Sequence, residues 1–349
     1  MKPTIRNIAE LAGVSPTSVS MVLNDRPIRV SEETKARIFE TAKSLGYSKK
    51  VRSDREQGGV GLKTIGLIYP SRENHYWNGC VSSIEEYGLS HDIHVLSMGN
   101  GNRSEKLVQM IQVMKKIGTK GLIVIAPDDV NEDENHTMVG NALFDYKKPF
   151  VLVDRAIDRV FCDFITIDNR QTGYLATEQL LAAGSDKVGV VIGEKSLYST
   201  RERVTGYKEA LSDSGISIKE EYIFYGSYDE QTGYAGAKQL VENGVQALFA
   251  GSDGIAKGIY RYCMDVGMDI GQDLSVIGVD NDPIGEWISP PLTTIGQSSD
   301  AQGKKALEIL MKRIEKEEIG PVKDLLFMPQ VINRSSLKQN TTLEAHGEE

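Results

Sequence analysis

Cysteine is scarce in this chain: Cys80, Cys162 and Cys263 are the only ones among its 349 residues. Their odd number and wide spacing exclude a framework of disulfide bonds and give no zinc-binding spacing. We therefore expect three structural thiols in a protein of the reducing cytoplasm. No N-terminal apolar run resembles a signal peptide, and no apolar run is long enough to span a membrane, so a membrane is not an expected partner.

The sequence also lacks the residue patterns of common catalytic sites. Its five histidines form neither a metal-binding spacing nor a catalytic triad pattern. The segment GNGN at Gly99–Asn102 does not have the spacing of a dinucleotide-binding loop, and GEKS at Gly193 lacks the first half of a P-loop. Residues 280–282, Asp-Asn-Asp, come without the glycine and glutamate of an EF-hand. We expect no enzyme activity, no cofactor and no metal site.

Charge is distributed unevenly along the chain. The net charge is −9, but residues 1–60 contain eleven Lys and Arg against seven Asp and Glu, so this segment carries +4 and the remainder −13. A basic N-terminal segment followed by an acidic remainder indicates that DNA binding is confined to the N-terminal part of the chain. A hydrophobic content of 40% over this length predicts sizeable cores and more than one domain.

The stretch TIRNIAELAGVSPTSVSMVLN, which begins at Thr4, predicts two short helices joined by a tight turn. Thr4 can cap the first helix, in which Ile8, Leu11 and Ala12 are expected to share an inward apolar face. Gly13 stands where that helix stops, and glycine readily adopts the backbone conformation that the turn needs. The expected first helix is therefore amphipathic and needs a partner on which to pack.

The second helix follows Ser15, which can cap it, with Pro16 in its first turn. Its apolar face contains Val19, Val22 and Leu23, and its opposite face contains Thr17, Ser20, Met21 and Asn24. A third helix, from Ser31 to Leu45, supplies inward apolar residues for both. Three helices in this order predict an all-α helix-turn-helix headpiece over residues 1–47, whose second helix enters the DNA major groove. A small helical subdomain without a ligand is the alternative.

The same residues carry a family resemblance. AELAGVSPTSVSMVLN, followed by VSEETKARIFETAKSLGY, closely resembles the N-terminal signature of the lac repressor (LacI/GalR) family of bacterial transcription regulators. The resemblance implies a periplasmic-binding-protein-like core behind the headpiece, and in the family the positions of Pro16, Thr17 and Met21 touch base edges. The DNA-binding residues that we expect are Thr4, Ser15, Pro16, Thr17, Ser20, Met21, Asn24, Arg29, Lys49, Lys50 and Arg52.

Residues 48–63 are expected to form a hinge between domains, because Gly58, Gly59 and Gly61 loosen the chain there. The basic residues of this segment suit contact with DNA phosphates. The family hinge places a leucine in the minor groove, whereas this chain has Glu56 in that place, so we expect a weak wedge. An ordinary solvated linker is the alternative.

From Thr64 onward, strand and helix patterns alternate. The apolar runs TIGLIY, IHVLSM, GLIVIA and PFVLVD predict a first series of buried parallel strands, and FITID opens a second series with VGVVIG, YIFYG, ALFAG and LSVIGVD. Helical patterns lie between them, at about residues 77–90, 103–117, 135–146, 172–183, 201–214, 230–243 and 255–266. This alternation predicts an α/β core over residues 64–336 with two doubly wound parallel-sheet lobes.

By the family resemblance, the chain crosses between lobes near Thr166, Gly296 and Met328. The expected first lobe then contains residues 64–166 and 297–328, and the expected second lobe contains residues 167–296 and 329–336. Residues 296–334 show one more helical pattern and two short strands. Residues 337–349 are polar and lack heptad spacing, so we expect a disordered tail and no tetramerising coiled coil.

Ligands of such folds bind at the carboxyl ends of the parallel strands, between the lobes. The loops expected there hold guanidinium, carboxylate and aromatic side chains, which together suit a hydroxyl-rich ring. The expected effector-binding residues are Asn74, Tyr76, Trp77, Asp154, Arg155, Arg203, Ser252, Asp253, Asp280 and Gln297. In the family, the positions of Tyr76, Arg203, Ser252, Asp280 and Gln297 line the effector pocket. The alternatives are a surface salt bridge between Asp154 and Arg155, and core packing of Tyr76 or Trp77.

The sequence thus indicates a cytoplasmic transcriptional regulator, a homodimeric repressor that binds a pseudo-palindromic operator in double-stranded DNA under the control of a small ligand. Most effectors of the family are sugars or sugar phosphates, with purines as an exception, so we expect a carbohydrate. The alternatives are a free-standing sugar-binding protein and a Rossmann-type enzyme, each with a non-functional headpiece. The missing signal peptide argues against the first, and the missing catalytic set argues against the second.

Overall fold

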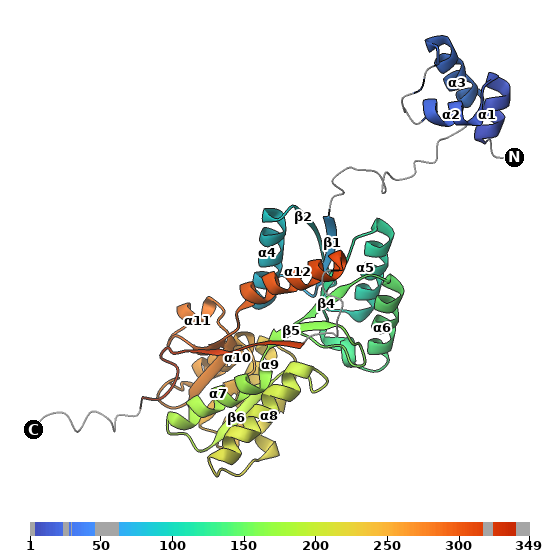
Figure 1. Ribbon diagram of the computed structural model, residues 1–349. Coiled ribbons are helices and arrows are strands. Elements are labelled where there is room, and N and C mark those ends of the chain that lie inside the picture. Colours follow the sequence, from blue (N-terminus) through green and yellow to red (C-terminus); the bar gives the residue numbers. More distant parts are fainter. Residues whose placement is uncertain (1–3, 24–27, 29, 46–62, 317–323, 340–349) are drawn as a thin grey trace, which may run out of the picture. The chain divides into compact units, whose positions relative to one another are not determined.

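The computed structural model describes residues 4–23, 28, 30–45, 63–316 and 324–339. The chain divides into two compact units, residues 1–61 and 62–349. Figure 1 shows that the first unit consists of helices and the second of helices and strands.

The N-terminal unit contains α1 (Ile5–Ala12), α2 (Pro16–Leu23) and α3 (Glu32–Ser44). Thr4 and Asn7 cap α1 reciprocally: the Thr4 hydroxyl accepts a hydrogen bond from the Asn7 N–H (3.4 Å), and Asn7 Oδ1 accepts one from the Thr4 N–H (2.9 Å). Gly13 ends α1 at φ 66°, in the left-handed region that glycine adopts without strain. The buried core of the unit consists of Ile8, Ala9, Ala12, Val19, Val22, Ile38 and Ala42.

The expected inward position of Leu11 is wrong, because its side chain is 65% exposed. The buried stripe of α1 contains Ile8, Ala9 and Ala12. Leu11 lies about 100° around the helix axis from Ala12, and this angle turns it away from the stripe. The inward positions of Val19 and Val22 on α2 are confirmed.

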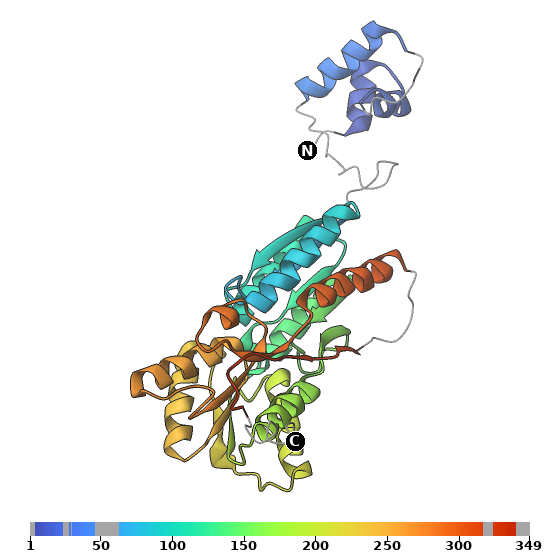
Figure 2. The same ribbon diagram turned by 90° about the vertical axis from the view of Figure 1, so that its left-hand side faces the viewer.

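The first of two six-stranded sheets in the core has the strand order β11-β5-β4-β3-β1-β2, with parallel pairings. Its strands are β1 (Lys63–Tyr69), β2 (Ile93–Gly99), β3 (Leu122–Ile125), β4 (Phe150–Val153), β5 (Asp163–Ile167) and β11 (Asp324–Phe327). The helices that cover it are α4 (His75–Ser90) and α12 (Ser299–Glu315) on one face, and α5 (Ser104–Ile117) and α6 (Asn135–Tyr146) on the other. Figure 2 shows α4 and α12 from their own side.

Strand β1 shows why these strands read as continuous apolar runs. Ile65 and Leu67 pack in the cluster that contains α4 and α12, whereas Ile68 packs in the cluster that contains α5 and α6. Successive residues of a strand point to opposite faces, so a strand covered on both faces is apolar at every position. The alternation of strands and helices in the sequence therefore reports a sheet between two helical layers.

The second sheet has the order β12-β10-β9-β8-β6-β7, in which β12 runs antiparallel to β10 and the other pairings are parallel. Its strands are β6 (Val188–Ile192), β7 (Ile223–Tyr225), β8 (Ala247–Ala250), β9 (Ser275–Asp280), β10 (Thr293–Gly296) and β12 (Gln330–Ile332). One face carries α7 (Asn169–Ala182) and α8 (Tyr198–Asp213), and the other carries α9 (Glu230–Glu242) and α10 (Asp253–Val266). The short elements are η1 (Asp128–Asn131), η2 (Glu220–Tyr222) and α11 (Ile284–Trp287).

Helices α7 and α8 approach each other closely at two glycines. A Cβ atom on Gly173 would lie 2.0 Å from the carbonyl oxygen of Arg203, and one on Gly206 would lie 1.9 Å from that of Arg170. A side chain at either position would collide with the backbone of the neighbouring helix. This contact brings Arg203 of α8 against the N-terminal part of α7.

The chain passes between the two sheets after β5, after β10 and between β11 and β12. The segment FITID, which we expected to open the second series, forms β5 and pairs with β4 in the first sheet. That expectation is wrong because an apolar strand pattern reports burial on both faces but does not reveal the neighbouring strand. The second lobe begins instead with α7.

The expected disorder of residues 337–349 is wrong for the part that the structure describes. Leu337 packs against the core of the second lobe, and the Lys338 N–H donates a hydrogen bond to Ser275 Oγ (3.0 Å). Residues 340–349 lie outside the described residues, as does the hinge segment from residue 46 to residue 62. The expected hinge helix and its Glu56 therefore stay predictions.

The three cysteines are free and buried, as expected of structural thiols. Burial raises the pKa of the Cys263 thiol to about 11, so that the neutral thiol prevails at neutral pH. Within the described ranges, no helix combines the length and apolar character needed to cross a membrane. In the same ranges, no three His, Cys, Asp or Glu side chains gather as a metal site would require.

Candidate functional site

Helix α2 is the candidate DNA-reading helix. Ser15 caps it, since its Oγ accepts a hydrogen bond from the Ser18 N–H (3.0 Å). Pro16 and Thr17 are exposed and Ser20 and Met21 are partly exposed, so these side chains are available on the outward side of the helix. Thr4 caps α1 in the same unit. The other expected DNA-binding residues lie outside the described part of the chain: Asn24, Arg29, Lys49, Lys50 and Arg52.

Three of the expected effector-binding residues form one buried cluster on the first lobe. Trp77, in the first turn of α4, donates its indole N–H to Asp154 Oδ2 (2.9 Å). The guanidinium of Arg155 lies over the indole ring, 4.5 Å from its centroid, and forms an ion pair with Asp128. Asp154 and Arg155 are buried, and the ion-pair distance between them is 3.9 Å. The alternative of a surface salt bridge between these two residues is therefore wrong.

Tyr76 lies beside this cluster and packs in the core of the first lobe. Its hydroxyl donates a hydrogen bond to Gln302 Oε1 of α12 (2.8 Å). Burial raises the pKa of the Tyr76 hydroxyl well above its ordinary value, and the charges of Asp154 and Asp280 raise it further. Asn74 caps α4, because its Oδ1 accepts a hydrogen bond from the Trp77 N–H (3.0 Å).

The second lobe contributes Arg203 and Asp280. Arg203 is buried on α8, where Nε donates to Asn169 Oδ1 (2.8 Å) and one Nη donates to the carbonyl oxygen of Gly251 (2.6 Å). Asp280 ends β9 at φ 113° and accepts a hydrogen bond from the side-chain amide of Gln297. Burial raises the pKa of Asp280 to about 7, against the opposing effects of Arg203 and Gln297. The surroundings of Asp280 therefore stabilise the negative charge of its ionised carboxylate only weakly.

Ser252 and Asp253 have structural contacts within the second lobe. Ser252 caps α10, since its Oγ accepts a hydrogen bond from the Ile255 N–H (3.2 Å). Asp253 accepts hydrogen bonds from the Thr294 hydroxyl (2.8 Å) and the Asp282 N–H (2.7 Å). Burial raises the pKa of Asp253 well above its ordinary value. Both oxygens of the Asp253 carboxyl therefore already accept hydrogen bonds, one from β10 and one from the segment that follows β9.

Side chains from the two lobes come together around Asp154 and Asp280. The charge of Asp154 raises the pKa of Asp280, and both charges raise the pKa of Tyr76. Hydrogen bonds link the two lobes at this place: the Thr166 hydroxyl donates to the Asp154 carbonyl oxygen (3.3 Å), Asn169 Nδ2 donates to Thr166 Oγ1 (3.2 Å), and Arg203 Nε donates to Asn169 Oδ1 (2.8 Å). Gln297 joins Asp280 from the crossing that follows β10. Asp154 and Asp280 are therefore the centre of the candidate effector site.

Three residues of this site were not predicted from the sequence: Asp128, Asn169 and Gln302. Asp128 follows β3, so the rule that selected other strand ends could have found it. Asn169 and Gln302 have no local signal, because their partners Arg203 and Tyr76 lie 34 and 226 residues away in the sequence. Gln302 Nε2 and Gln297 Oε1 are buried, and neither has a hydrogen-bond partner among the described residues. Such atoms are costly to bury, which makes them candidates for ligand contact.

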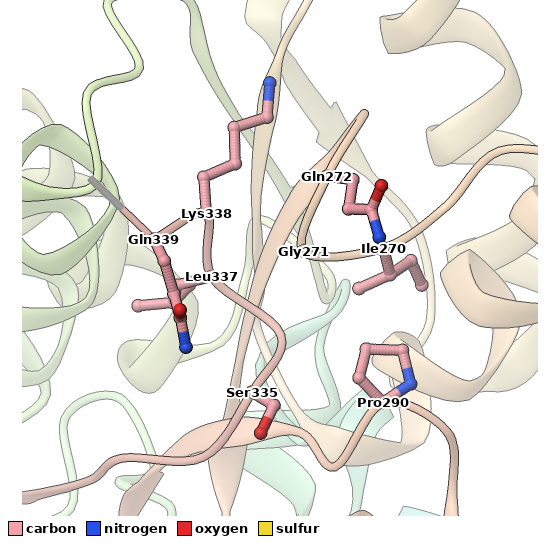
Figure 3. A pocket seen from close by; sticks show the side chains of 8 residues that line it. All are labelled: Ile270, Gly271, Gln272, Pro290, Ser335, Leu337, Lys338 and Gln339. Atoms are coloured by element: carbon pink, nitrogen blue, oxygen red, sulfur yellow. The ribbon is translucent and has the colours of Figure 1, made fainter. Parts of the chain in front are cut away.

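Two cavities of the core are lined by none of the expected effector residues. One of about 490 Å³ lies between Leu337, Lys338 and Gln339 on one side and Ile270, Gln272 and Pro290 on the other, with Gly271 and Ser335 completing its wall (Figure 3). Another of about 500 Å³ is lined by Lys195, Ser196, Thr200, Arg201, Val204 and Tyr225. The convergence of buried polar groups, and not cavity size, therefore identifies the candidate site.

A helix-turn-helix unit joined to two α/β lobes, each built on a sheet of mainly parallel strands, defines a class of DNA-binding regulators with a periplasmic-binding-protein-like core. Comparison with known families agrees: residues 4–50 match the lacI family of bacterial regulatory proteins, and residues 177–337 match the periplasmic binding protein-like domain. The HTH-type transcriptional repressor PurR of Actinobacillus pleuropneumoniae serotype 3 is 30% identical over 342 residues, covering 96% of this chain and 98% of the relative. The chain belongs to the lacI family and is a transcriptional repressor, not an enzyme.

Other relatives and solved structures are consistent with this assignment. The ribose operon repressor of Haemophilus influenzae is 29% identical over 343 residues, covering 96% of this chain and 98% of that protein. The lac repressor dimer bound to operator and the anti-inducer ONPF has a TM-score of 0.71 at 22% identity, over 97% of this chain and 100% of that chain. A LacI family regulator from Enterococcus faecium with bound ribose has a TM-score of 0.69 at 25% identity, over 79% and 99%.

Proposed function

We propose that this repressor acts in the cytoplasm as a homodimer on a pseudo-palindromic operator, and that a small sugar bound where the core lobes meet controls its DNA binding. The observation that carries the proposal is the chain of hydrogen bonds that runs from Asp154 of the first lobe through Thr166 and Asn169 to Arg203 of the second lobe. A ligand that binds the carboxylates of both Asp154 and Asp280 favours one arrangement of the lobes over another. Such a difference in affinity is what couples two sites, typically by about 1–3 kcal/mol.

The hydrogen-bonding groups at this place favour a ligand with many hydroxyl groups over a sugar phosphate. Arg155 is engaged by Asp128, the carbonyl oxygen of Ala126 and the indole ring, and Arg203 is engaged by Asn169 and Gly251. The guanidinium groups that would bind a phosphate are thus already in use. The groups that remain are chiefly acceptors, namely the two carboxylates and Gln297 Oε1, and hydroxyl groups donate to acceptors.

The proposed effector set is Tyr76, Trp77, Asp154, Arg155, Arg203, Asp280, Gln297 and Gln302. It omits Asn74, Ser252 and Asp253, whose side chains cap helices or join strands within one lobe. Two solved structures with a similar fold support the choice of probes, since one contains ribose and the other, of the regulator CelR, contains cellobiose. A thermal-shift screen should therefore compare ribose, cellobiose, ribose 5-phosphate and nucleobases.

The test is operator affinity with and without the sugar that stabilises the protein in this screen. Full-length Asp280→Ala and Arg203→Ala proteins should bind operator as the wild type does but should lose the response to the sugar. Asp186→Ala, at an exposed site before β6, is the matched control and should keep the response. Variants that respond like the wild type would place the ligand elsewhere. Variants that fail to bind operator without ligand would show that these residues maintain the DNA-competent fold.

The homodimer is proposed to form through the core. Trp287 on α11 and Leu89 on α4 are 84% and 81% exposed, so both offer apolar surface to a partner subunit. Helices α4 and α11 lie on the same side of the core in both views (Figures 1 and 2). Analytical ultracentrifugation should show a dimer that Trp287→Ala shifts toward monomer. Phe144→Ala, equally exposed on α6 at the opposite face of the first sheet, should leave the dimer unchanged.

A further inference from the structure

The first lobe has one strongly basic end. Strands β1, β3 and β4 begin there, because they run parallel, and α5, α6 and α12 end there. A cavity of about 270 Å³ between Lys63, Lys120, Pro149 and Glu315 shows that these segments meet. The basic residues at these termini are Lys63, Lys115, Lys116, Lys120, Lys147, Lys148, Lys312, Arg313 and Lys316, and the acidic ones are Asp92, Asp145, Asp163, Glu315 and Asp324, the first residue of β11.

Much of the positive charge at this end is not neutralised by ion pairs among the residues that the structure describes. Most of these acidic residues form ion pairs with other basic residues: Glu315 pairs with Lys63, Asp145 with Lys115, and Asp163 with Arg313. Five exposed lysines, which we call the basic end, have ammonium groups that form no ion pair with any other residue that the structure describes. They are Lys116, Lys120, Lys147, Lys312 and Lys316.

This surface contrasts with the charge of the chain around it. Residues 61–349 carry a net charge of −13, so a group of five lysines without an ion pair is opposite in sign to the net charge of this part of the chain. A surface of this kind attracts a polyanion, while the rest of the unit is repelled by it. The basic end also lies where the chain from the DNA-binding unit enters the core, since β1 begins at Lys63.

We propose that the basic end binds the phosphates of DNA beside the operator. The inference rests on the operator binding proposed above, and it assigns to the core a part of the DNA contact that does not read sequence. Lysine suits this task because its ammonium group is a point charge on a flexible stem, without the planar geometry that recognises a particular base. The contact therefore adds affinity and salt dependence but no base preference.

The predicted size of the effect follows from counterion release. Each phosphate neutralised by a lysine steepens the plot of log K against log salt by about 0.9. Loss of three contacts lowers the slope by about 2.7, so a fourfold increase in salt would weaken the wild type about 40-fold more than the variant. The triple variant Lys116→Gln, Lys120→Gln and Lys147→Gln is suitable, because these side chains are exposed and their removal leaves the core intact. Lys316 is spared because the acidic Glu317 and Glu318 follow it in the sequence, outside the described residues.

The experiment measures affinity for two duplexes, the operator alone and the operator extended by about 12 base pairs on each side, at several salt concentrations. The operator is the sequence recovered by selection with the full-length wild type. The control is Lys187→Gln, Lys238→Gln and Lys304→Gln, which changes the net charge equally at exposed sites outside the basic end. The wild type and the control should gain affinity from the extension, and the triple variant should gain less and show the smaller slope.

The outcomes separate this inference from the proposed function. A wild type that selects no operator would remove the proposed function itself. A triple variant that keeps the wild-type slope and the full gain from the extension would overturn the present inference while leaving operator binding intact. If the triple variant keeps the wild-type slope and the full gain from the extension but loses binding to an acidic protein, the surface would be assigned to that protein instead of DNA. A control that loses as much as the triple variant would show a general charge effect and would also overturn the inference.

Discussion

Replacing Asp280 by asparagine should make the protein more stable at alkaline pH while removing its response to the effector. The pKa of Asp280 rises from 3.8 to about 7, so the folded state binds its proton more tightly than the unfolded state does. Wild-type stability therefore decreases as the pH increases from about 4 to 7, and the full penalty is present above pH 7. At about 1.4 kcal/mol for each pKa unit, ionisation of this group costs up to about 4 kcal/mol.

Asparagine is the informative replacement because it retains two features of the native residue. It tolerates the positive φ of 113° better than most residues, and its Oδ1 can still accept the hydrogen bond from Gln297. Urea denaturation of both proteins at pH 4, 7 and 8.5 should give similar free energies of unfolding at pH 4, and an advantage for Asp280→Asn that is close to its full size by pH 7 and changes little at pH 8.5. A variant that is less stable than the wild type at pH 8.5 would refute this account, because the ionised carboxylate would then be stabilising.

Further predictions concern packing and DNA reading. Gly206→Ala should destabilise the core by about 3 kcal/mol or more in urea denaturation, because its Cβ would lie 1.9 Å from the Arg170 carbonyl oxygen. Gly254→Ala is the control and should have little effect, because a Cβ at Gly254 would make only ordinary contacts. Equal stability of the two variants would contradict the predicted collision. Met21→Arg should shift operator selection toward guanine at one half-site position by about 1–3 kcal/mol, and unchanged selected sequences would count against α2 as the reading helix. Glu56→Leu should tighten DNA binding and increase bending; unchanged affinity and bend angle would mean that residue 56 does not reach the minor groove.

The fold could be predicted wherever a pattern has one physical cause. Helix α1 begins at Ile5 because Thr4 and Asn7 satisfy its first N–H groups, and this is visible in the sequence. The runs of apolar residues in the core identify strands covered on both faces. The position of β5 could not be predicted, because its neighbour in the sheet depends on where the chain turns back. Leu11 shows a second limit, since a hydrophobic residue at helical spacing can still lie at the edge of a buried stripe.

For the candidate site, the rule of strand ends selected residues from both lobes that the structure brings together. It could not separate Asp280 from Asp253, since both follow apolar strands of the second lobe. The distinction depends on Thr294 and the Asp282 N–H, which occupy Asp253 but are distant in the sequence or part of the backbone. It also could not find Gln302, whose contact with Tyr76 joins the two ends of the core sequence.

The late position of α12 has a consequence for synthesis on the ribosome. Ala306, Leu307 and Leu310 of this helix complete the cluster that covers one face of the first sheet. The ribosome must make every strand of the second sheet except β12 before these residues emerge, so a nascent first lobe presents that apolar face to the cell for much of translation. Exposed apolar surface of this kind promotes aggregation. The chain should therefore depend on chaperones that bind nascent proteins, and truncation before residue 299 should yield insoluble protein.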